Sequence, residues 1–343
     1  MSESARPTLS DVAARAGVSV SAVSRVLRDA PSTRVGAETR QRIQDAAREL
    51  GYRPNFAARA LKSARTNVIG LVVPVVTNAI FSEILRGAEE EAQSHGYLVF
   101  VARTEGMIDG GEETIPRLIG EGRLDGVLLQ VGDAMRPEDL HIFLNGSLPL
   151  VVMNSVHTGH AGSVILDDAR GMRMATEHLI GLGHTHIGLV GGLPRSDSGR
   201  RREEGFRGAM ADADLPVPEH YVTRLGYEPR QGGAALGALA GLAEPPTAIV
   251  VANVNAAHGA LMEARRLGLS VPHDLSIAAM HDAWTAENAW PPLTTVRMPL
   301  VEFGRQAARD LLERIETGAL VDRVVTDPPP ELIVRESTAP PAR

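Results

Sequence analysis

The stretch TLSDVAARAGVSVSAVSRVL, from Thr8 to Leu27, contains two short helical patterns on either side of Gly17. Thr8 followed by Asp11 is typical of a capping box, and apolar residues recur at helical spacing in both halves. Gly17 can adopt the positive φ that ends a helix. The outward side of the second half carries small side chains and Arg25, which suits a helix that reads base edges in the major groove. The pattern predicts a DNA-binding helix-turn-helix, although an ordinary helical hairpin has the same spacing.

Helical spacing continues beyond this stretch. Residues 37–50 form a third amphipathic pattern that ends at Gly51, and three such helices would make a compact head. Residues 55–62, NFAARALK, follow Pro54 and are short for an isolated helix in water. They form either a plain linker helix or a hinge that becomes ordered on DNA, with Leu61 as an apolar wedge between base pairs.

Composition and charge limit the class of protein. The 343 residues are 43% hydrophobic and include no cysteine, which favours a globular protein of about two or three domains and excludes disulfides and thiolate metal sites. Residues 1–65 carry a net charge of +6 and the remainder −13, as expected for a nucleic-acid-binding head on an acidic body. Because neither an apolar leader nor a membrane-length apolar run is evident, we expect a cytoplasmic protein, associated with the nucleoid when it is bound to DNA.

From Asn67 onward, apolar runs alternate with helical patterns. Strands are predicted over 68–73, 97–102, 126–130 and 150–153, with helices over 81–94, 112–121 and 137–145. The pattern then repeats with helices over 169–182, 201–211, 232–242 and 256–267 and strands over 186–190, 221–224, 248–252 and 276–280. This alternation predicts two α/β lobes with parallel sheets and a cleft between them.

Polar and aromatic residues follow the predicted strands, where open α/β sheets bind ligands. They are Thr77, Asn78, Phe81, Asp167, Arg195, Arg202, Tyr227, Asn253, Asn255, His281, Asp282 and Trp284. Each residue taken alone fits a surface loop or a helix cap at least as well. The set as a whole predicts a site for a small polar ligand.

Over essentially its whole length the chain resembles the LacI family of bacterial transcription regulators. The resemblance rests on the stretch quoted above, on ETRQRIQDAARELGYRPNFAARALKSARTNVIGLVVP, and on EHLIGLGHTHIGLVGG, RRREEGFRGAM, VPHDLSI, PPLTTVRMP and ELIVREST. It implies a transcriptional repressor that binds a pseudo-palindromic operator as a homodimer. A small effector in the cleft would control the affinity for DNA.

The resemblance also implies the domain organisation. Residues 1–52 would form the helix-turn-helix domain, 53–65 a hinge helix and linker, and 66–343 a core for effector binding and dimerisation. The core would resemble periplasmic binding proteins, with an N-lobe of about 66–167 and 294–326 and a C-lobe of about 168–293 and 327–343.

By the same resemblance, base contacts are expected from the start of the second helix. The expected DNA-binding residues are Thr8, Ser19, Val20, Ser21, Ala22, Ser24 and Arg25 in the head, and Tyr52, Asn55, Ala58, Arg59 and Leu61 after it. Arg25 is the expected guanine contact, and Leu61 matches the family's minor-groove leucine.

Family positions also indicate effector contacts, with Arg202 at the position of the family's effector-binding arginine. The expected effector-binding residues are Thr77, Asn78, Phe81, Asp167, Arg202, Tyr227, Asn253, His281 and Trp284. His281 and Val254 stand where the family usually has aspartates, and arginines at 195 and 200–202 enrich the cleft edge in cations. We therefore expect a sugar or a sugar derivative, with acidic derivatives among the candidates. His281 would make recognition pH-sensitive near its reference pKa of about 6.5, or would simply donate to a hydroxyl.

Two other classes of function share parts of this pattern. An enzyme is disfavoured because no phosphate-binding glycine loop occurs, and because His184–His186 as a metal pair and His281–Asp282 as a catalytic pair lack further partners at suitable spacing. A small-molecule receptor of the periplasmic type fits the body but not the basic head. We expect no enzymatic activity, no cofactor and no metal.

Overall fold

The computed structural model describes residues 7–27, 35–52, 65–104, 120–132, 135, 140, 143–144, 146, 148–157 and 159–342. The chain divides into two compact units, Met1–Thr66 and Asn67–Arg343. The predicted helix over 55–62, with Asn55, Ala58, Arg59 and Leu61, lies outside the described residues, as does most of 112–121 and 137–145.

The first unit is a helical head made of α1 (Leu9–Ala16), α2 (Val20–Val26) and α3 (Ala37–Glu49). Thr8 and Asp11 form the predicted capping box at the start of α1, and Gly17 ends this helix with a φ of 67°. The three helices share one apolar core, which consists of Val12, Ala13, Ala16, Val23, Val26, Ile43, Ala46 and Ala47. The head therefore has the predicted helix-turn-helix arrangement.

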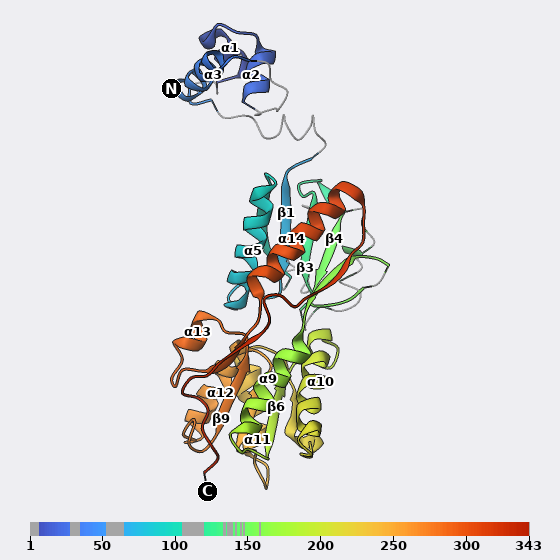
Figure 1. Cartoon of the computed structure of the whole chain (residues 1–343), viewed down its shortest axis with the longest axis vertical. Coiled ribbons are helices and arrows are strands. Elements are labelled where there is room, and N and C mark those ends of the chain that lie inside the picture. The colour runs from blue at the N-terminus through green and yellow to red at the C-terminus, as the bar shows by residue number, and fades with distance from the viewer. Residues whose placement is uncertain are drawn as a thin grey trace. The chain divides into compact units, whose positions relative to one another are not determined.

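The N-lobe of the second unit is built on a six-stranded sheet in the order β11-β5-β4-β3-β1-β2. Its strands are β1 (Val68–Val73), β2 (Leu98–Arg103), β3 (Gly126–Gln130), β4 (Leu150–Met153), β5 (Gly162–Leu166) and β11 (Asp322–Val325), and all neighbours are parallel. Helices α5 (Ile80–Ser94) and α14 (Leu300–Thr317) pack against each other over this sheet (Figure 1).

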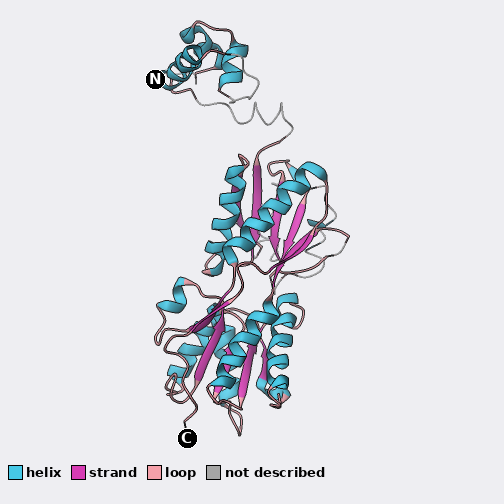
Figure 2. Ribbon diagram, in the orientation of Figure 1, coloured by secondary structure: helices cyan, strands magenta, loops and turns pink. Residues whose placement is uncertain are grey.

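The C-lobe has a second six-stranded sheet in the order β12-β10-β9-β8-β6-β7. Its strands are β6 (Ile187–Gly191), β7 (Val222–Arg224), β8 (Ala248–Val251), β9 (Ser276–Met280), β10 (Thr294–Arg297) and β12 (Glu331–Ile333). Helices α9 (Asp168–Gly181), α10 (Asp197–Asp212), α11 (Pro229–Ala240), α12 (Val254–Arg266) and α13 (Trp284–Glu287) accompany them. Figure 2 shows the strands of each lobe flanked by helices, as the alternating sequence pattern predicted. Only β12 among the described strands runs antiparallel to its neighbour.

The chain crosses between the lobes three times, from β5 to α9, from β10 to α14 and from β11 to β12. The second crossover differs from the sequence-based expectation. Because β10 pairs with β9, Thr294–Arg297 belong to the C-lobe sheet, and the chain changes lobe after Arg297 instead of at Leu293. The start of α10 also differs from the prediction, because the Ser196 hydroxyl accepts a bond from Gly199 N and caps the helix four residues earlier than expected.

Candidate functional site

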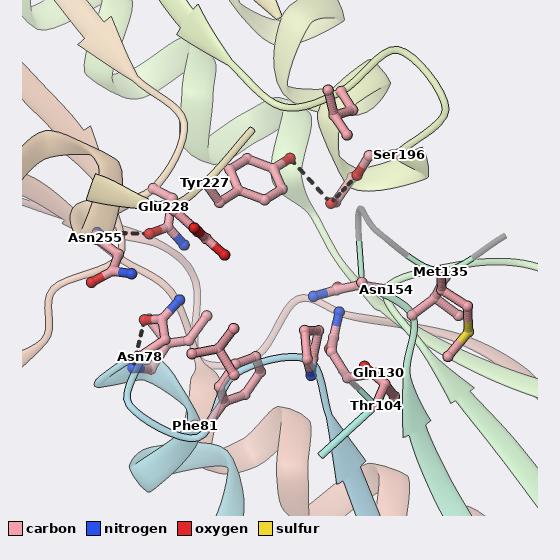
Figure 3. Close-up of a pocket in the computed structure, with 18 of the residues that line it drawn as sticks. Asn78, Phe81, Thr104, Gln130, Met135, Asn154, Ser196, Tyr227, Glu228 and Asn255 are labelled. Atoms are coloured by element: carbon pink, nitrogen blue, oxygen red, sulfur yellow. Dashed lines mark hydrogen bonds between the residues drawn. The ribbon is translucent and has the colours of Figure 1, made fainter. Parts of the chain in front are cut away.

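A cavity of about 320 Å³ lies between the two lobes. Residues near the carboxyl ends of parallel strands line it from both sides, including Thr104, Gln130 and Asn154 in the N-lobe and Tyr227, Asn253 and His281 in the C-lobe. Figure 3 shows Asn78 and Phe81 on one side and Tyr227 and Glu228 across from them. Open α/β sheets bind ligands at this edge, so the cavity is the candidate ligand site.

Arg202 of α10 forms part of the C-lobe wall and is buried. Its Nε donates to Asp168 Oδ1 at 2.8 Å, and one terminal nitrogen donates to the carbonyl oxygen of Ala252 at 2.7 Å. The guanidinium carbon lies 5.2 Å from the centroid of the Tyr227 ring, within the range of a cation–π contact. The guanidinium is thus held in a fixed orientation before any ligand binds.

Asp168, the first residue of α9, is shared between two arginines. Its Oδ2 accepts from Arg201 at 2.7 Å while Oδ1 accepts from Arg202, and its side chain is fully buried. Arg201 also donates to the carbonyl oxygen of Asn154 in the N-lobe at 3.2 Å. The buried carboxylate therefore fixes both guanidiniums and connects the cavity wall to the first crossover.

His281 follows β9 and is 1% exposed, with a φ of 73° that is uncommon outside glycine. Its Nε2 lies 3.4 Å from a terminal nitrogen of Arg202. Burial, and secondarily the charge of Arg202, lower the pKa of His281 well below its ordinary value. The expectation of a titration near pH 6.5 is therefore wrong for the unliganded protein, because both effects favour the neutral imidazole.

Four amide side chains in the cavity have their oxygen bonded to a backbone N–H group. The pairs are Asn78 with Ile80 at 3.3 Å, Asn154 with Leu166 at 3.4 Å, Gln231 with Glu228 at 2.9 Å and Asn253 with Asn255 at 2.6 Å. Since an amide nitrogen cannot accept a hydrogen bond, these contacts fix which end of each amide is the oxygen. In Figure 3 the nitrogens of Asn78 and Asn154 lie toward the middle of the cavity.

Asp197 links the lobes beside the cavity. This first residue of α10 accepts from the Ser155 hydroxyl at 2.6 Å and from Val156 N at 3.2 Å, both in the N-lobe loop after β4. Burial alone would raise the pKa of Asp197, but the hydrogen bonds from Ser155 and Arg200 hold it below its ordinary value. The carboxylate is therefore ionised and joins the two lobes at neutral pH.

Six of the residues expected at the ligand site line the cavity, namely Asn78, Phe81, Arg202, Tyr227, Asn253 and His281. The other three lie elsewhere. Thr77 is exposed in the turn before α5, Asp167 caps α9 by accepting from Arg170 N, and Trp284 is 67% exposed at the start of α13. Ligand contact by these nine residues stays a prediction.

Sequence reasoning missed several polar residues of the cavity. Asn154 follows the predicted strand over 150–153, and Gln130 is the last residue of the strand over 126–130, so the rule that selected the other residues would have found both. Gln231 lies on the first turn of α11, and no pattern in the sequence places it at the site.

In the head, the expected base-reading residues lie on the outer side of α2. Val20, Ser21 and Arg25 are exposed, while Ala22 and Ser24 are half-buried. The hydroxyls of Thr8 and Ser19 cap the two helices, and Tyr52 packs at the edge of the head core. The exposed set suits readout of base edges, which stays a prediction.

One member of each histidine pair considered in the sequence, His184 and Asp282, makes structural contacts in the described part of the chain. His184 bonds through Nδ1 to the Thr247 hydroxyl and through Nε2 to the carbonyl oxygen of Ala339, each at 2.9 Å. The Asp282 carboxylate accepts from Thr295 and Arg297. The described residues contain no group of three or more acidic or histidine side chains arranged to hold a metal ion.

Across the same described residues, none of the helices combines the length and apolarity needed to cross a membrane.

Two family descriptions match the chain. Residues 8–55 match bacterial regulatory proteins of the lacI family, and residues 176–338 match the periplasmic binding protein-like domain. The transcriptional regulator DegA of Bacillus subtilis (strain 168) is 33% identical, over 98% of this chain and 99% of its own. The transcriptional repressor PurR of Vibrio cholerae serotype O1 (strain M66-2) is 32% identical, over 96% of this chain and 97% of its own.

Solved structures show the same relationship. A LacI family transcriptional regulator from Mycobacterium smegmatis is 44% identical with a TM-score of 0.75, over 80% of this chain and 100% of that one. The lac repressor dimer bound to operator and an anti-inducer is 26% identical with a TM-score of 0.80, over 98% of this chain and 100% of that chain. A LacI family regulator from Enterococcus faecium with bound ribose is 26% identical with a TM-score of 0.68, over 80% of this chain and 99% of that chain.

Proposed function

The chain belongs to the LacI family of bacterial regulatory proteins, and from this premise we propose that it is a transcriptional repressor whose affinity for DNA is set by a small effector. It binds a pseudo-palindromic operator as a homodimer. The observation that carries the proposal is the combination, in one chain, of a helix-turn-helix head and a polar cavity between two lobes. A protein that acts on the chromosome in this way works in the cytoplasm.

The outer side of α2 supports sequence-specific DNA binding. Arg25 is exposed there and has the forked donors that bind the O6 and N7 atoms of guanine together. Val20 and Ser21, one turn earlier, supply short side chains that add preference at neighbouring base pairs. The lac repressor, which this chain resembles over nearly its whole length, is described on its operator.

Two exposed apolar surfaces on the second unit support a homodimer. Leu98 and Phe100 lie on β2, the edge strand of the N-lobe sheet, and Leu98 is 67% exposed. On the C-lobe, Met262 and Trp290 are 73% and 87% exposed and line one groove. Each surface presents apolar side chains that suit the same surface of a second copy.

The interlobe cavity supports a sugar or a sugar derivative as effector. Phe81 and Tyr227 provide aromatic faces, and the amides around them provide directional hydrogen bonds. The related regulator from Enterococcus faecium is described with ribose. Because the cavity is formed by both lobes, an occupant changes their relative closure, and a coupling of this kind alters the affinity for operator.

The experiment that tests this function is the selection of DNA fragments by the full-length protein at near-physiological salt. We expect enrichment of one short inverted repeat. A matched protein that lacks residues 1–62 should bind none of the enriched fragments. Recovery of unspecific DNA whose binding vanishes with added salt, or DNA binding that survives the deletion, would contradict the proposal.

A further inference from the structure

A second cavity, with a volume of about 400 Å³, adjoins the interlobe cavity. Residues after β3 and β4 line it from the N-lobe, and residues at the start of α10 line it from the C-lobe. We call it the outer cavity, and its lining consists of Val131, Gly132, Met135, Leu140, Leu144, Asn154–His157 and Arg195–Ser198.

The outer cavity and the interlobe cavity share several lining residues. Met135 of the N-lobe and Ser196 of the C-lobe are two of them. Figure 3 shows Met135 and Ser196 at one end of the interlobe cavity, while Asn78 and Asn255 lie at the other. The outer cavity therefore extends the interlobe cavity beyond the end at which Met135 and Ser196 lie.

The lining of the outer cavity is mixed. Leu140, Leu144 and Val156 provide apolar surface from the N-lobe, whereas the His157 imidazole and the Asp197 carboxylate are polar. A sugar ring is mixed in the same way, because its faces carry C–H groups and its hydroxyls project from the rim. Such a ring can contact the apolar side chains with a face and the polar groups with its hydroxyls.

A purely apolar ligand group fits this lining less well. It would cover the ionised carboxylate of Asp197 and the hydroxyls of Ser196 and Ser198 without replacing the water that hydrates them. Removing water from polar groups without new hydrogen bonds costs free energy. The chemistry of the outer cavity therefore favours a second sugar ring over an apolar substituent.

The two volumes favour a ligand that is larger than one sugar ring. The interlobe cavity, at about 320 Å³, is near the lower end of the roughly 300–1,000 Å³ that is typical of small-molecule sites. A single ring bound there would leave the outer cavity to solvent.

We propose that the effector is a disaccharide whose two rings occupy the two cavities. One ring lies in the interlobe cavity beside Phe81 and Tyr227, and the other lies in the outer cavity beside Val156 and Asp197. The proposal rests on the proposed role of the interlobe cavity as the effector site.

Calorimetric titration of the full-length protein compares each disaccharide with the methyl glycoside of its non-reducing sugar. The pairs are cellobiose with methyl β-D-glucopyranoside, lactose with methyl β-D-galactopyranoside, and maltose with methyl α-D-glucopyranoside. Phenyl β-D-glucopyranoside is the probe with an apolar substituent. We expect at least one disaccharide to bind at least tenfold more tightly than its methyl glycoside and than the phenyl glucoside.

A methyl glycoside that binds as tightly as its disaccharide would show that the outer cavity takes no part in binding. The phenyl glucoside as the tightest ligand would replace the second sugar ring with an apolar group. Both results overturn the disaccharide and leave the repressor function standing. Failure of all these ligands to bind would overturn the disaccharide as well, while operator selection still tests the function separately.

The variant Val156→Trp tests the outer cavity by itself. Val156 lines the outer cavity but not the interlobe cavity, and it is 43% exposed, so a larger side chain does not disturb a core. We expect the affinity for the tightest disaccharide to fall at least tenfold, with unchanged affinity for its methyl glycoside and an unchanged circular dichroism spectrum. Val324→Trp, at a 50% exposed position on β11, is the matched control and should change neither affinity. Equal losses for both ligands in Val156→Trp would contradict a separate site for the second ring.

A second readout comes from His157, which lines the outer cavity with its Nε2 3.2 Å from the Ser155 hydroxyl. We expect the NMR signals of its ring protons to shift with the disaccharide but not with the methyl glycoside. His178, which bonds to the Thr338 hydroxyl in the C-lobe, is the internal control and should not shift. His157 signals that respond equally to both ligands, or to neither, would place the second ring outside the outer cavity.

Discussion

Asp168 is the carboxylate that Arg201 and Arg202 share beside the interlobe site. Its side chain is fully buried, and its two oxygens accept hydrogen bonds from Arg201 and Arg202. It therefore fixes the positions of both guanidiniums in the cavity wall. A carboxylate in this position removes most of the penalty of burying two cations. The orientation of Arg202 is therefore a property of the empty protein.

Asp168→Asn should strongly destabilise the second unit. The change leaves two guanidiniums without their carboxylate, and loss of one partner from a buried ion pair costs about 3–5 kcal/mol. Urea unfolding measures the free energy of unfolding. Asp214→Asn, at an exposed position, is the control and should change it by less than about 0.5 kcal/mol. An unchanged free energy of unfolding in Asp168→Asn would mean that solvent reaches the two guanidiniums.

Arg25→Ala should reduce operator affinity by about 1–3 kcal/mol and relax the preference at one base pair, because a bidentate guanine contact is lost. Binding to single-base operator variants measures both effects. Arg266→Ala, which removes a surface arginine paired with Glu263 on the C-lobe, should leave DNA binding unchanged. A uniform loss on all sequences would instead assign Arg25 to a phosphate contact.

The sequence predicted which residues lie near the cavity better than it predicted their burial and the direction of their side chains. The rule that polar residues follow strand ends found Arg202, Asn253 and His281 near the cavity, because parallel strands end at a common edge. The same rule also selected Trp284, which lies at the start of α13 and is exposed, since spacing does not determine where a side chain points. The low pKa of His281 depends on burial by distant segments, which no local pattern encodes.

At the level of elements, helix pairs in the second unit pack at very short range through glycines. A Cβ added at Gly205 of α10 would lie 2.2 Å from the carbonyl oxygen of Ala169 on α9. The backbones of α9 and α10 can approach closely only because Gly205 has no side chain. This contact positions Arg202, one turn earlier on the same helix, against Asp168.

Gly205→Ala should therefore lower the free energy of unfolding by about 1–3 kcal/mol, as overpacking does in other cores, and weaken effector binding with it. Gly181→Ala is the matched control. A Cβ at Gly181, the last residue of α9, meets no atom within 4 Å, so alanine should be neutral or stabilise the helix by up to about 1 kcal/mol. Thermal unfolding of the two variants compares them directly, and equal stability would show that α9 and α10 can separate.

Elements with a strong period were predicted, and short or irregular ones were not. The strand over 68–73 is a continuous apolar run, the strand over 276–280 is apolar after Ser276, and both have the predicted bounds. By contrast, β5 begins with Gly162 and Ser163, and three of the four residues of β11 are exposed, so neither has the pattern of a buried strand. α14 has apolar residues at helical spacing and was open to prediction from its own pattern.

For the whole molecule, the groove lined by Met262 and Trp290 should control assembly. Trp290→Asp puts a charge into the proposed contact between copies and should shift the protein toward monomers, with at least tenfold weaker dimerisation by sedimentation equilibrium. Operator affinity should fall in parallel, since two heads must bind together. Trp284→Asp, at another exposed tryptophan outside the groove, is the control. Unchanged assembly of Trp290→Asp would exclude this surface as the dimer contact.

The three crossovers also determine the order in which the nascent chain can be completed on the ribosome. Most of the C-lobe, from α9 to β10, is one continuous segment, so it can fold as soon as Arg297 has emerged. The N-lobe begins 100 residues earlier, at Val68, but lacks α14 and β11 until Val325 is synthesised. During translation, the face of α5 that packs against α14 and the edge of β5 that pairs with β11 therefore stay uncovered until the last part of the chain has been synthesised. The C-lobe in turn receives its last strand, β12, only when Ile333 has been synthesised, so both lobes are completed by the last part of the chain.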